Sequence, residues 1–190
     1  AQLGYRCHIC APPGDNVACE VAAQSTIAAY DDLVALKAFA KACDVVTFEF
    51  ENVPVMSVKA IARDVPIHPP VKALEIGQDR VEEKEFVRRL GGTTANFAAA
   101  RSEIEVEDAV AAVGTPAILK TIRMGYDGKG QIRVTSKSEL ASAWRRAGAQ
   151  PLIAEQMVRF DAEFSVILVR GTDGEIRYWD SPRNAHEDGI

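Results

Sequence analysis

The sequence lacks long hydrophobic runs and blocks of basic residues. No apolar stretch approaches the roughly 20 residues that a transmembrane helix requires, and the first ten residues, AQLGYRCHIC, contain no signal-peptide core. The formal net charge is −5 and the sequence pI is about 5.3. These features argue against nucleic acid or an anionic membrane as the main partner. We therefore expect a cytoplasmic protein with no nucleic-acid and no membrane partner.

Cysteine is scarce as well, because four residues are too few for a disulfide scaffold. Cys7 and Cys10 form a C-x-x-C pair, which raises the possibility of a metal or redox site. The surrounding YRCHIC is typical of a short strand, and strand side chains alternate, so the two thiols should point to opposite faces. No second cysteine pair lies at zinc-ligand spacing. The sequence therefore favours an ordinary strand here.

The first half of the chain alternates predicted strands and helices. Its apolar run CDVVTFEF, residues 43–50, is typical of a buried strand in a parallel sheet. Shorter strands are predicted over residues 5–10 and 65–68, and helices over residues 31–42 and 54–62. This βαβ order predicts an α/β fold, an open and mostly parallel Rossmann-like sheet with helices on its faces.

The second half predicts a different, α+β organisation. Residues 79–90 form a helix with a capping-box pattern at its start, and Gly91-Gly92 ends it. A small module of strands and two helices follows, and then a hairpin around Gly171–Gly174. The expected strands are residues 97–100, 117–121, 131–134, 152–156, 164–169 and 176–179, and the expected helices are residues 103–113 and 137–147. We expect four parts, namely residues 1–76, 77–95, 96–158 and 159–190.

Three polar residues, Glu49, Glu51 and Asn52, follow the predicted strand that ends in VVTF. In open α/β sheets, ligands bind beyond the carboxyl ends of the strands. These side chains therefore suit hydrogen bonding to a small substrate. A solvated turn that caps the next helix explains them equally well, and the residues alone leave both readings open.

The segment KTIRMGYDGKGQ, from Lys120 to Gln131, has the clearest chemical signature of the sequence. Its closely spaced glycines let successive backbone N–H groups approach an anion, and its lysines add positive charge suited to a di- or triphosphate. The spacing matches neither the P-loop nor the Rossmann glycine pattern. The segment therefore predicts a phosphate-binding lid between two strands, with a glycine-containing hairpin turn as the ordinary alternative.

Three motifs together resemble a known family. FEFEN, QDR-x-x-EK and GYDGKGQ occur here in the order in which they occur in the 5-(carboxyamino)imidazole ribonucleotide synthetase family of ATP-grasp ligases. The similarity extends over nearly the whole chain, and the combination is specific where each motif alone is weak. The resemblance implies a Rossmann-like pre-ATP-grasp domain, a connecting helix, an ATP-grasp lid domain and the start of a C-terminal ATP-grasp domain for the four parts named above.

The resemblance also implies roles for individual residues. Arg80 and Lys120 would contact the phosphates of ATP, and the lid would cover them. Tyr126 and Asp127 would face the substrate, with Asp127 orienting bicarbonate or the accepting amine. Glu49, Glu51 and Asn52 remain the candidates for binding the substrate because of their place at a strand end, as given above. The remaining ATP contacts would come from the lid residues Gly125, Tyr126, Asp127, Gly128, Lys129, Gly130 and Gln131, the adenine hinge Glu155, Gln156, Met157 and Val158, the ribose-binding Glu163, and His186.

The implied reaction is the ATP-dependent carboxylation of aminoimidazole ribonucleotide by bicarbonate, with ATP and Mg²⁺ required and a homodimer as the expected assembly. Family members are longer at both ends, so we expect these residues to lack part of the active site, including the magnesium ligands. Other ATP-grasp ligases are alternatives, such as a formate-dependent glycinamide ribonucleotide transformylase or a biotin carboxylase. A non-catalytic nucleotide-binding fragment is a third.

Overall fold

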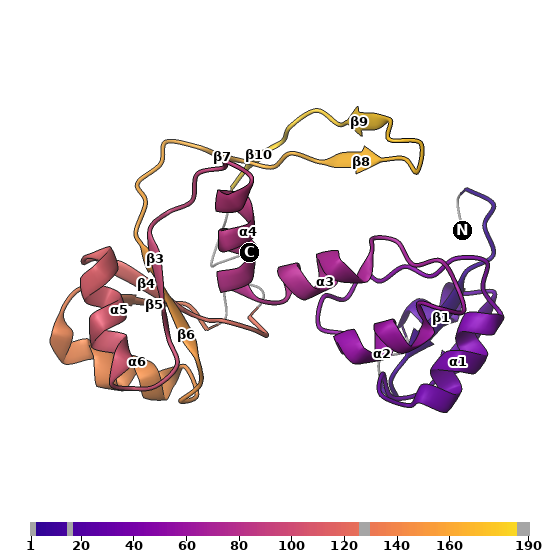
Figure 1. Cartoon of the computed structure of the whole chain (residues 1–190), viewed down its shortest axis with the longest axis horizontal. Coiled ribbons are helices and arrows are strands. Elements are labelled where there is room, and N and C mark those ends of the chain that lie inside the picture. Colours follow the sequence, from indigo (N-terminus) through magenta and orange to yellow (C-terminus); the bar gives the residue numbers. More distant parts are fainter. Residues whose placement is uncertain (1–2, 15–16, 126–129, 186–190) are drawn as a thin grey trace. The chain divides into compact units, whose positions relative to one another are not determined.

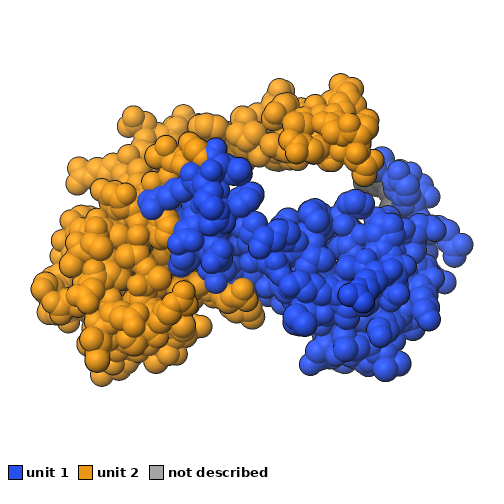
Figure 2. Space-filling model, viewed as in Figure 1, with its two compact units in different colours: residues 1–90 blue, residues 91–190 orange. Residues whose placement is uncertain are grey.

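The computed structural model describes residues 3–14, 17–125 and 130–185 (Figure 1). The chain divides into two compact units, Ala1–Leu90 and Gly91–Ile190 (Figure 2). Each unit has its own cluster of buried hydrophobic side chains. No helix within the described ranges has both the length and the apolar character that a membrane span requires.

The first unit begins with a parallel strand pair. Strands β1 (His8–Ala11) and β2 (Gln24–Ile27) pair in register from His8 opposite Gln24 to Ala11 opposite Ile27. A short 3-10 helix, Val17–Val21, lies between them in the sequence. A second parallel contact, a single bridge, joins Val46 to Ile67. The parallel pairing that the strand–helix alternation predicts is therefore present, although the sheet is small.

The predicted strand over residues 43–50 is wrong in extent, because only Val46 makes a bridge. Its N–H donates to the Pro66 carbonyl at 2.9 Å and its carbonyl accepts from His68 N–H at 3.0 Å. Pro66, Pro69 and Pro70 surround this partner segment and have no N–H to donate, so the ladder cannot lengthen. Val45 is also 55% exposed, which a strand buried on both faces would not allow.

Four helices complete the first unit. They are α1 (Leu33–Lys41), α2 (Val55–Ile61), α3 (Val71–Gly77) and α4 (Arg80–Arg89). Asp32 and Asp79 cap α1 and α4 by accepting bonds from N–H groups of the first turn. Glu85 and Arg89, one helical turn apart on α4, form an ion pair at 3.7 Å. Helix α3 was not predicted, because the Pro69-Pro70 before it resembles a turn. Proline is tolerated at a helix start, and Pro70 stands at the cap.

The second unit contains a four-stranded antiparallel sheet in the order β3-β6-β4-β5. Helices α5 (Glu105–Val113) and α6 (Leu140–Arg146) pack on one face of it (Figure 1). Gly114, at a φ of 81°, ends α5. A 3-10 turn, Lys137–Glu139, precedes α6. The strands are β3 (Phe97–Ala100), β4 (Ala117–Thr121), β5 (Ile132–Val134) and β6 (Leu152–Gln156).

Side-chain alternation divides the residues of this sheet between its two faces. Ala117 and Leu119 of β4, like Leu152 and Ala154 of β6, belong to the core formed with α5 and α6. Residues one position away along a strand lie on the other face. Lys120 of β4 and Glu155 of β6 therefore share the face that the two helices do not cover.

Two hairpin-like pairs end the described chain. Strand β8 (Leu168–Arg170) pairs antiparallel with β9 (Ile176–Tyr178), which confirms the hairpin expected around Gly171–Gly174, although its strands are shorter than predicted. Strand β7 (Glu163–Phe164) pairs with β10 (Arg183–Asn184). The β7–β10 pair was not anticipated, because two-residue strands leave no periodic pattern.

Candidate functional site

Lys120 and Glu155 form a partly buried ion pair on the sheet of the second unit. Lys120 Nζ lies 2.9 Å from Glu155 Oε2, and the side chains are 24% and 10% exposed. Ile118 is directly opposite Glu155 and Lys120 is directly opposite Ile153, so Lys120 and Glu155 are diagonal neighbours on one sheet face. Such diagonal pairs lie within reach of long side chains. The β4–β6 register thus brings together two residues that the sequence analysis assigned to the nucleotide.

The glycine-rich segment begins where β4 ends. Met124 has a φ of 63° and Gly130 a φ of 77°, both in the left-handed region that favours glycine. A Cβ added to Gly130 would lie 3.7 Å from Thr121 Cγ2, an ordinary contact, so its backbone conformation rather than space favours glycine there. Gly125 and Gln131 lie within the described residues, whereas Tyr126, Asp127, Gly128 and Lys129 lie outside them.

The predicted adenine hinge, residues 155–158, extends from β6. Two of its backbone donors are used within the unit: Gln156 N–H donates to the Asn96 carbonyl at 2.8 Å, and Met157 N–H donates to the Pro116 carbonyl at 3.3 Å. These bonds fix the segment as a continuation of the strand. A base held by this segment would therefore need other backbone groups, such as the Gln156 carbonyl and the Val158 N–H.

Glu163 belongs to a small polar network that the sequence analysis did not foresee. Asn184 Nδ2 donates to Glu163 Oε1 at 2.9 Å, and Asn184 also exchanges bonds with Ser165. The β7–β10 register places Asn184 directly opposite Glu163. Asn184 thereby orients the carboxylate expected to hold a ribose. Asn184 lies two residues before His186, which is outside the described residues. This closeness to a predicted site residue is the sequence feature that could have indicated a role for Asn184.

The first unit gathers the other predicted site residues around one turn. Glu49 and Glu51 are exposed and Asn52 is half-buried. The Gln78 side-chain amide donates to the carbonyls of Glu51 and Val53, each at 2.7 Å. Gln78 lies two residues before Arg80, so the start of α4 and the turn at residues 51–53 lie close together. The sequence analysis quoted Gln78 within its QDR motif but assigned it no role.

Cys7 is exposed, whereas Cys10, Cys19 and Cys43 are half-buried, and two of these half-buried thiols have a raised pKa. Burial, and then the neighbouring Cys19 and Cys43, raises the pKa of Cys10. Burial, and then Asp44, raises the pKa of Cys43. A raised pKa keeps these groups as thiols at neutral pH, whereas metal binding and nucleophilic attack need the thiolate. All four cysteines are free.

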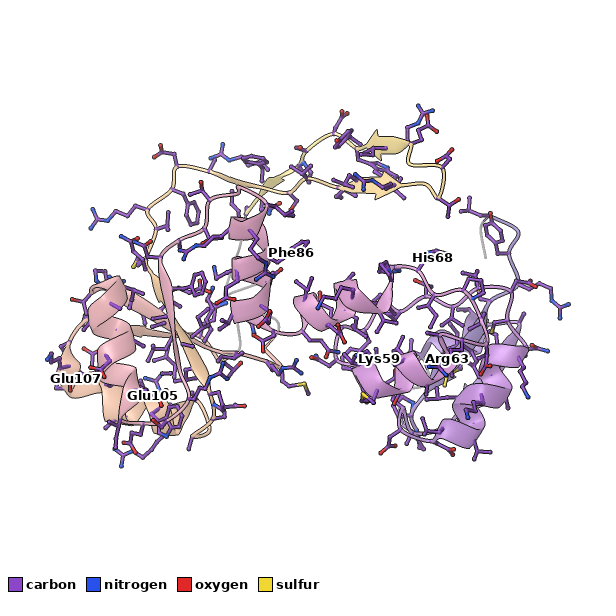
Figure 3. The ribbon with its side chains drawn as sticks, in the orientation of Figure 1. Lys59, Arg63, His68, Phe86, Glu105 and Glu107 are labelled. Atoms are coloured by element: carbon purple, nitrogen blue, oxygen red, sulfur yellow. The ribbon has the colours of Figure 1, made fainter. Side chains whose placement is uncertain are left out.

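Acidic residues at the start of α5 are occupied by local contacts. Glu105 and Glu107 project from this helix (Figure 3). Glu105 accepts the Arg101 N–H at 2.7 Å, and Glu107 pairs with Lys137 at 2.6 Å. Within residues 3–14, 17–125 and 130–185, no three His, Cys, Asp or Glu side chains converge as a metal site would require.

Comparison with known proteins gives these features a family context. Residues 85–190 match the model of the ATP-grasp domain, and residues 1–78 match the model of the ribonucleotide synthetase preATP-grasp domain. The N5-carboxyaminoimidazole ribonucleotide synthase of Brucella melitensis is 41% identical over all of this chain and 53% of its own length. The Pseudomonas aeruginosa protein of the same name is 40% identical over 85% of this chain and 45% of its own.

Solved structures show the same similarity in three dimensions. An N5-carboxyaminoimidazole ribonucleotide synthetase in complex with ADP is 31% identical with a TM-score of 0.92, over 100% of this chain and 50% of that one. The Staphylococcus aureus N5-carboxyaminoimidazole synthetase with ADP is 29% identical with a TM-score of 0.93, over 100% and 51%. The Aspergillus clavatus enzyme with ADP and 5-aminoimidazole ribonucleotide is 25% identical with a TM-score of 0.84, over 100% and 50%.

The chain thus spans about half the length of the synthases and synthetases that it matches. Both matched domain models and the structural similarity agree with the resemblance carried by FEFEN, QDR and GYDGKGQ. The chain therefore belongs to the ATP-grasp family and has the fold of the matching half of an N5-carboxyaminoimidazole ribonucleotide synthetase.

Proposed function

We propose that the protein containing this chain carboxylates 5-aminoimidazole ribonucleotide with bicarbonate and ATP, a step of purine biosynthesis. The observation that carries the proposal is the 41% identity of the whole chain to a synthase of that name. The ion pair between Lys120 and Glu155 supports it from the structure, because both residues were assigned to the nucleotide beforehand.

We propose that ATP lies over the sheet face that carries Lys120 and Glu155. Lys120 is partly exposed, so its ammonium group can move from the carboxylate to a phosphate without losing all contact with water. Arg80 would add a second phosphate contact and Glu163, held by Asn184, a ribose contact. The rest of the proposed ATP site is formed by the lid residues 125–131, the hinge residues 155–158, and His186.

The proposed chemistry has two steps. A bicarbonate oxygen attacks the γ-phosphorus of ATP, the bond to the β,γ-bridging oxygen breaks, and ADP leaves. The amine of aminoimidazole ribonucleotide then attacks the carbon of the resulting carboxyphosphate, phosphate leaves, and the nitrogen loses a proton. The protein contributes positioning and charge neutralisation, as in phosphoryl transfer generally. We assign orientation of bicarbonate or the amine to Tyr126 and Asp127, and substrate binding to Glu49, Glu51 and Asn52.

Magnesium is implied by the family, since it bridges the phosphates of bound nucleotides. One or two carboxylates are usually enough to hold it beside a bound nucleotide, and we propose that these ligands lie outside the residues of this chain. A cytoplasmic location, expected from the sequence, and a homodimer, implied by the family resemblance, are also proposals.

Titration of ATP onto the protein that contains this chain tests the nucleotide site. We expect Lys120→Ala to weaken ATP binding about 10- to 100-fold, because a charge-assisted bond to a phosphate is lost. Lys37→Ala on α1, an exposed lysine of the first unit, is the matched control and should bind ATP like the wild type. Equal affinities for wild type and Lys120→Ala would refute the assignment.

A further inference from the structure

Gln78 occupies the junction between two helices. Its backbone N–H donates to the Leu74 carbonyl at 3.0 Å and ends α3, while the next residue, Asp79, caps α4. The backbone of Gln78 is therefore fixed by α3 on one side and by α4 on the other. Because this backbone is fixed, the Gln78 side chain starts from a fixed position.

The side chain of Gln78 reaches a distant part of the sequence. Nε2 donates one bond to the Glu51 carbonyl and one to the Val53 carbonyl, both at 2.7 Å. A primary amide nitrogen carries two N–H groups, so one nitrogen can satisfy two carbonyls at once. A carboxylate of the same size has only acceptors and would repel both carbonyls.

The turn that receives these bonds is an irregular segment. Within the described residues of the first unit, residues 47–54 belong to no strand or helix, since the ladder stops at the Val46 bridge and α2 starts at Val55. The Phe50 ring stacks against Tyr30 at 6.2 Å between centroids. Val53 is buried. The Gln78 amide thus adds a polar contact that closes the turn between Val46 and α2.

We infer that Gln78 is a positioning residue for the substrate. It fixes the turn at residues 51–53, and with it Glu49, Glu51 and Asn52, beside the start of the helix that carries Arg80. This inference rests on the proposed function, which assigns those three residues to aminoimidazole ribonucleotide. The Asp79 cap holds α4 through separate bonds, so removing the Gln78 amide should release the turn and leave Arg80 in place.

The test uses two variants in the complete enzyme. Gln78→Met keeps the length of the side chain and removes both hydrogen bonds, and Gln78→Glu places acceptor against acceptor. Gln150→Met is the matched control, because Gln150 Nε2 also donates to a backbone carbonyl, that of Ala147 at 2.8 Å, in the other unit. The measurements are KM for aminoimidazole ribonucleotide, KM for ATP, and hydrogen exchange of the backbone amides of residues 49–53.

We expect both Gln78 variants to raise KM for aminoimidazole ribonucleotide about tenfold or more, with the larger effect for Gln78→Glu, because two bonds to the turn are lost. KM for ATP should change less than about threefold, and exchange at residues 49–53 should accelerate. Partial unfolding lowers kcat without altering KM, so it would not imitate this result. Gln150→Met should leave both KM values and this exchange unchanged.

Three outcomes would count against the inference. Unchanged KM for aminoimidazole ribonucleotide in an active Gln78→Met enzyme would overturn the positioning role, and so would an equal rise in both KM values. Unchanged exchange at residues 49–53 would show that other contacts hold the turn. A wild-type enzyme that does not use aminoimidazole ribonucleotide would overturn the proposed function itself, and the exchange measurement would still report whether Gln78 holds the turn.

Discussion

At the scale of single residues, the Lys120–Glu155 pair serves stability as well as the proposed nucleotide site. Glu155 is buried on the sheet, and Lys120 places an ammonium group 2.9 Å from its carboxylate. Removing one member of a buried ion pair leaves the other in an environment that penalises its charge. The pair therefore links the folding of the sheet to the position of the lysine.

A double-mutant cycle measures this link. We expect Lys120→Met to lower the free energy of unfolding by about 1–3 kcal/mol, less than for a fully buried pair because the lysine is partly exposed. Glu155→Gln should also be destabilising, and the double variant should lose less than the two single losses combined. Urea unfolding without nucleotide provides the values. Strictly additive losses would show that the two side chains do not interact energetically.

Glu139 makes the stability of the fold depend on pH, and the direction of this dependence follows from its hydrogen bonds. The Thr135 hydroxyl, the Thr135 N–H and the Ser136 hydroxyl all donate to its carboxylate and lower its pKa below the usual 4.5. A lowered folded-state pKa contributes stability above the unfolded-state value, and this contribution is lost as the pH falls through the folded-state pKa.

Glu139→Gln tests this contribution by urea unfolding between about pH 7 and pH 3. The wild type should be more stable than the variant near neutral pH, and the difference should shrink as the pH falls below 4.5. Glu103→Gln, an exposed substitution in the same unit, controls for the loss of one negative charge. A stability difference that stays constant across the pH range would contradict the assignment.

At the scale of secondary-structure elements, helix caps are the features that the sequence predicts best. Asp32 Oδ1 accepts the N–H groups of Val34 and Ala35 at 3.1 and 3.0 Å. We expect Asp32→Ala to cost about 1 kcal/mol, since two N–H groups of the first turn lose their acceptor. The neighbouring Asp31→Ala provides a matched control and should cost no more than a few tenths of a kcal/mol. Thermal unfolding with equal losses for the two variants would refute the cap.

Elements that depend on distant partners were predicted less well. The cap of α1 and the Gly114 stop of α5 depend on residues next to the helix, so the sequence contains their signal. The strand predicted over residues 43–50 needed a partner with backbone donors beyond the single Val46 bridge, and Pro66 and Pro70 on either side of it have no N–H. Nothing in CDVVTFEF itself reveals that.

At the scale of the whole chain, the two units have separate cores. Leu119 is fully buried in the second core and Leu36 is buried in the first. We expect Leu119→Ala to destabilise the second unit by about 2–5 kcal/mol, the usual range for a buried leucine. Amide exchange should accelerate in β3–β6 and stay unchanged in α1 and α2. The reciprocal Leu36→Ala should reverse this pattern, and equal acceleration in both units would show one cooperative core.

The residues of the candidate site were predicted from sequence motifs. Their geometry depends on how the strands pair, which the motifs do not reveal. Lys120 and Glu155 were both named from the sequence, but their contact depends on the β4–β6 register. Asn184 and Gln78 were missed because each acts through another residue rather than on a ligand. Such roles become visible only when donor and acceptor are seen together. Tyr126, Asp127, Gly128, Lys129 and His186 lie outside the described residues and stay predictions.

The most direct test of the central claim is the substrate dependence of ATP consumption by the complete protein. We predict that ADP release requires both 5-aminoimidazole ribonucleotide and bicarbonate, and that N5-carboxyaminoimidazole ribonucleotide accumulates in step with ADP. Glycinamide ribonucleotide with formate, and biotin with bicarbonate, should support no turnover above background. Turnover with either of these pairs, or none with aminoimidazole ribonucleotide, would contradict the account.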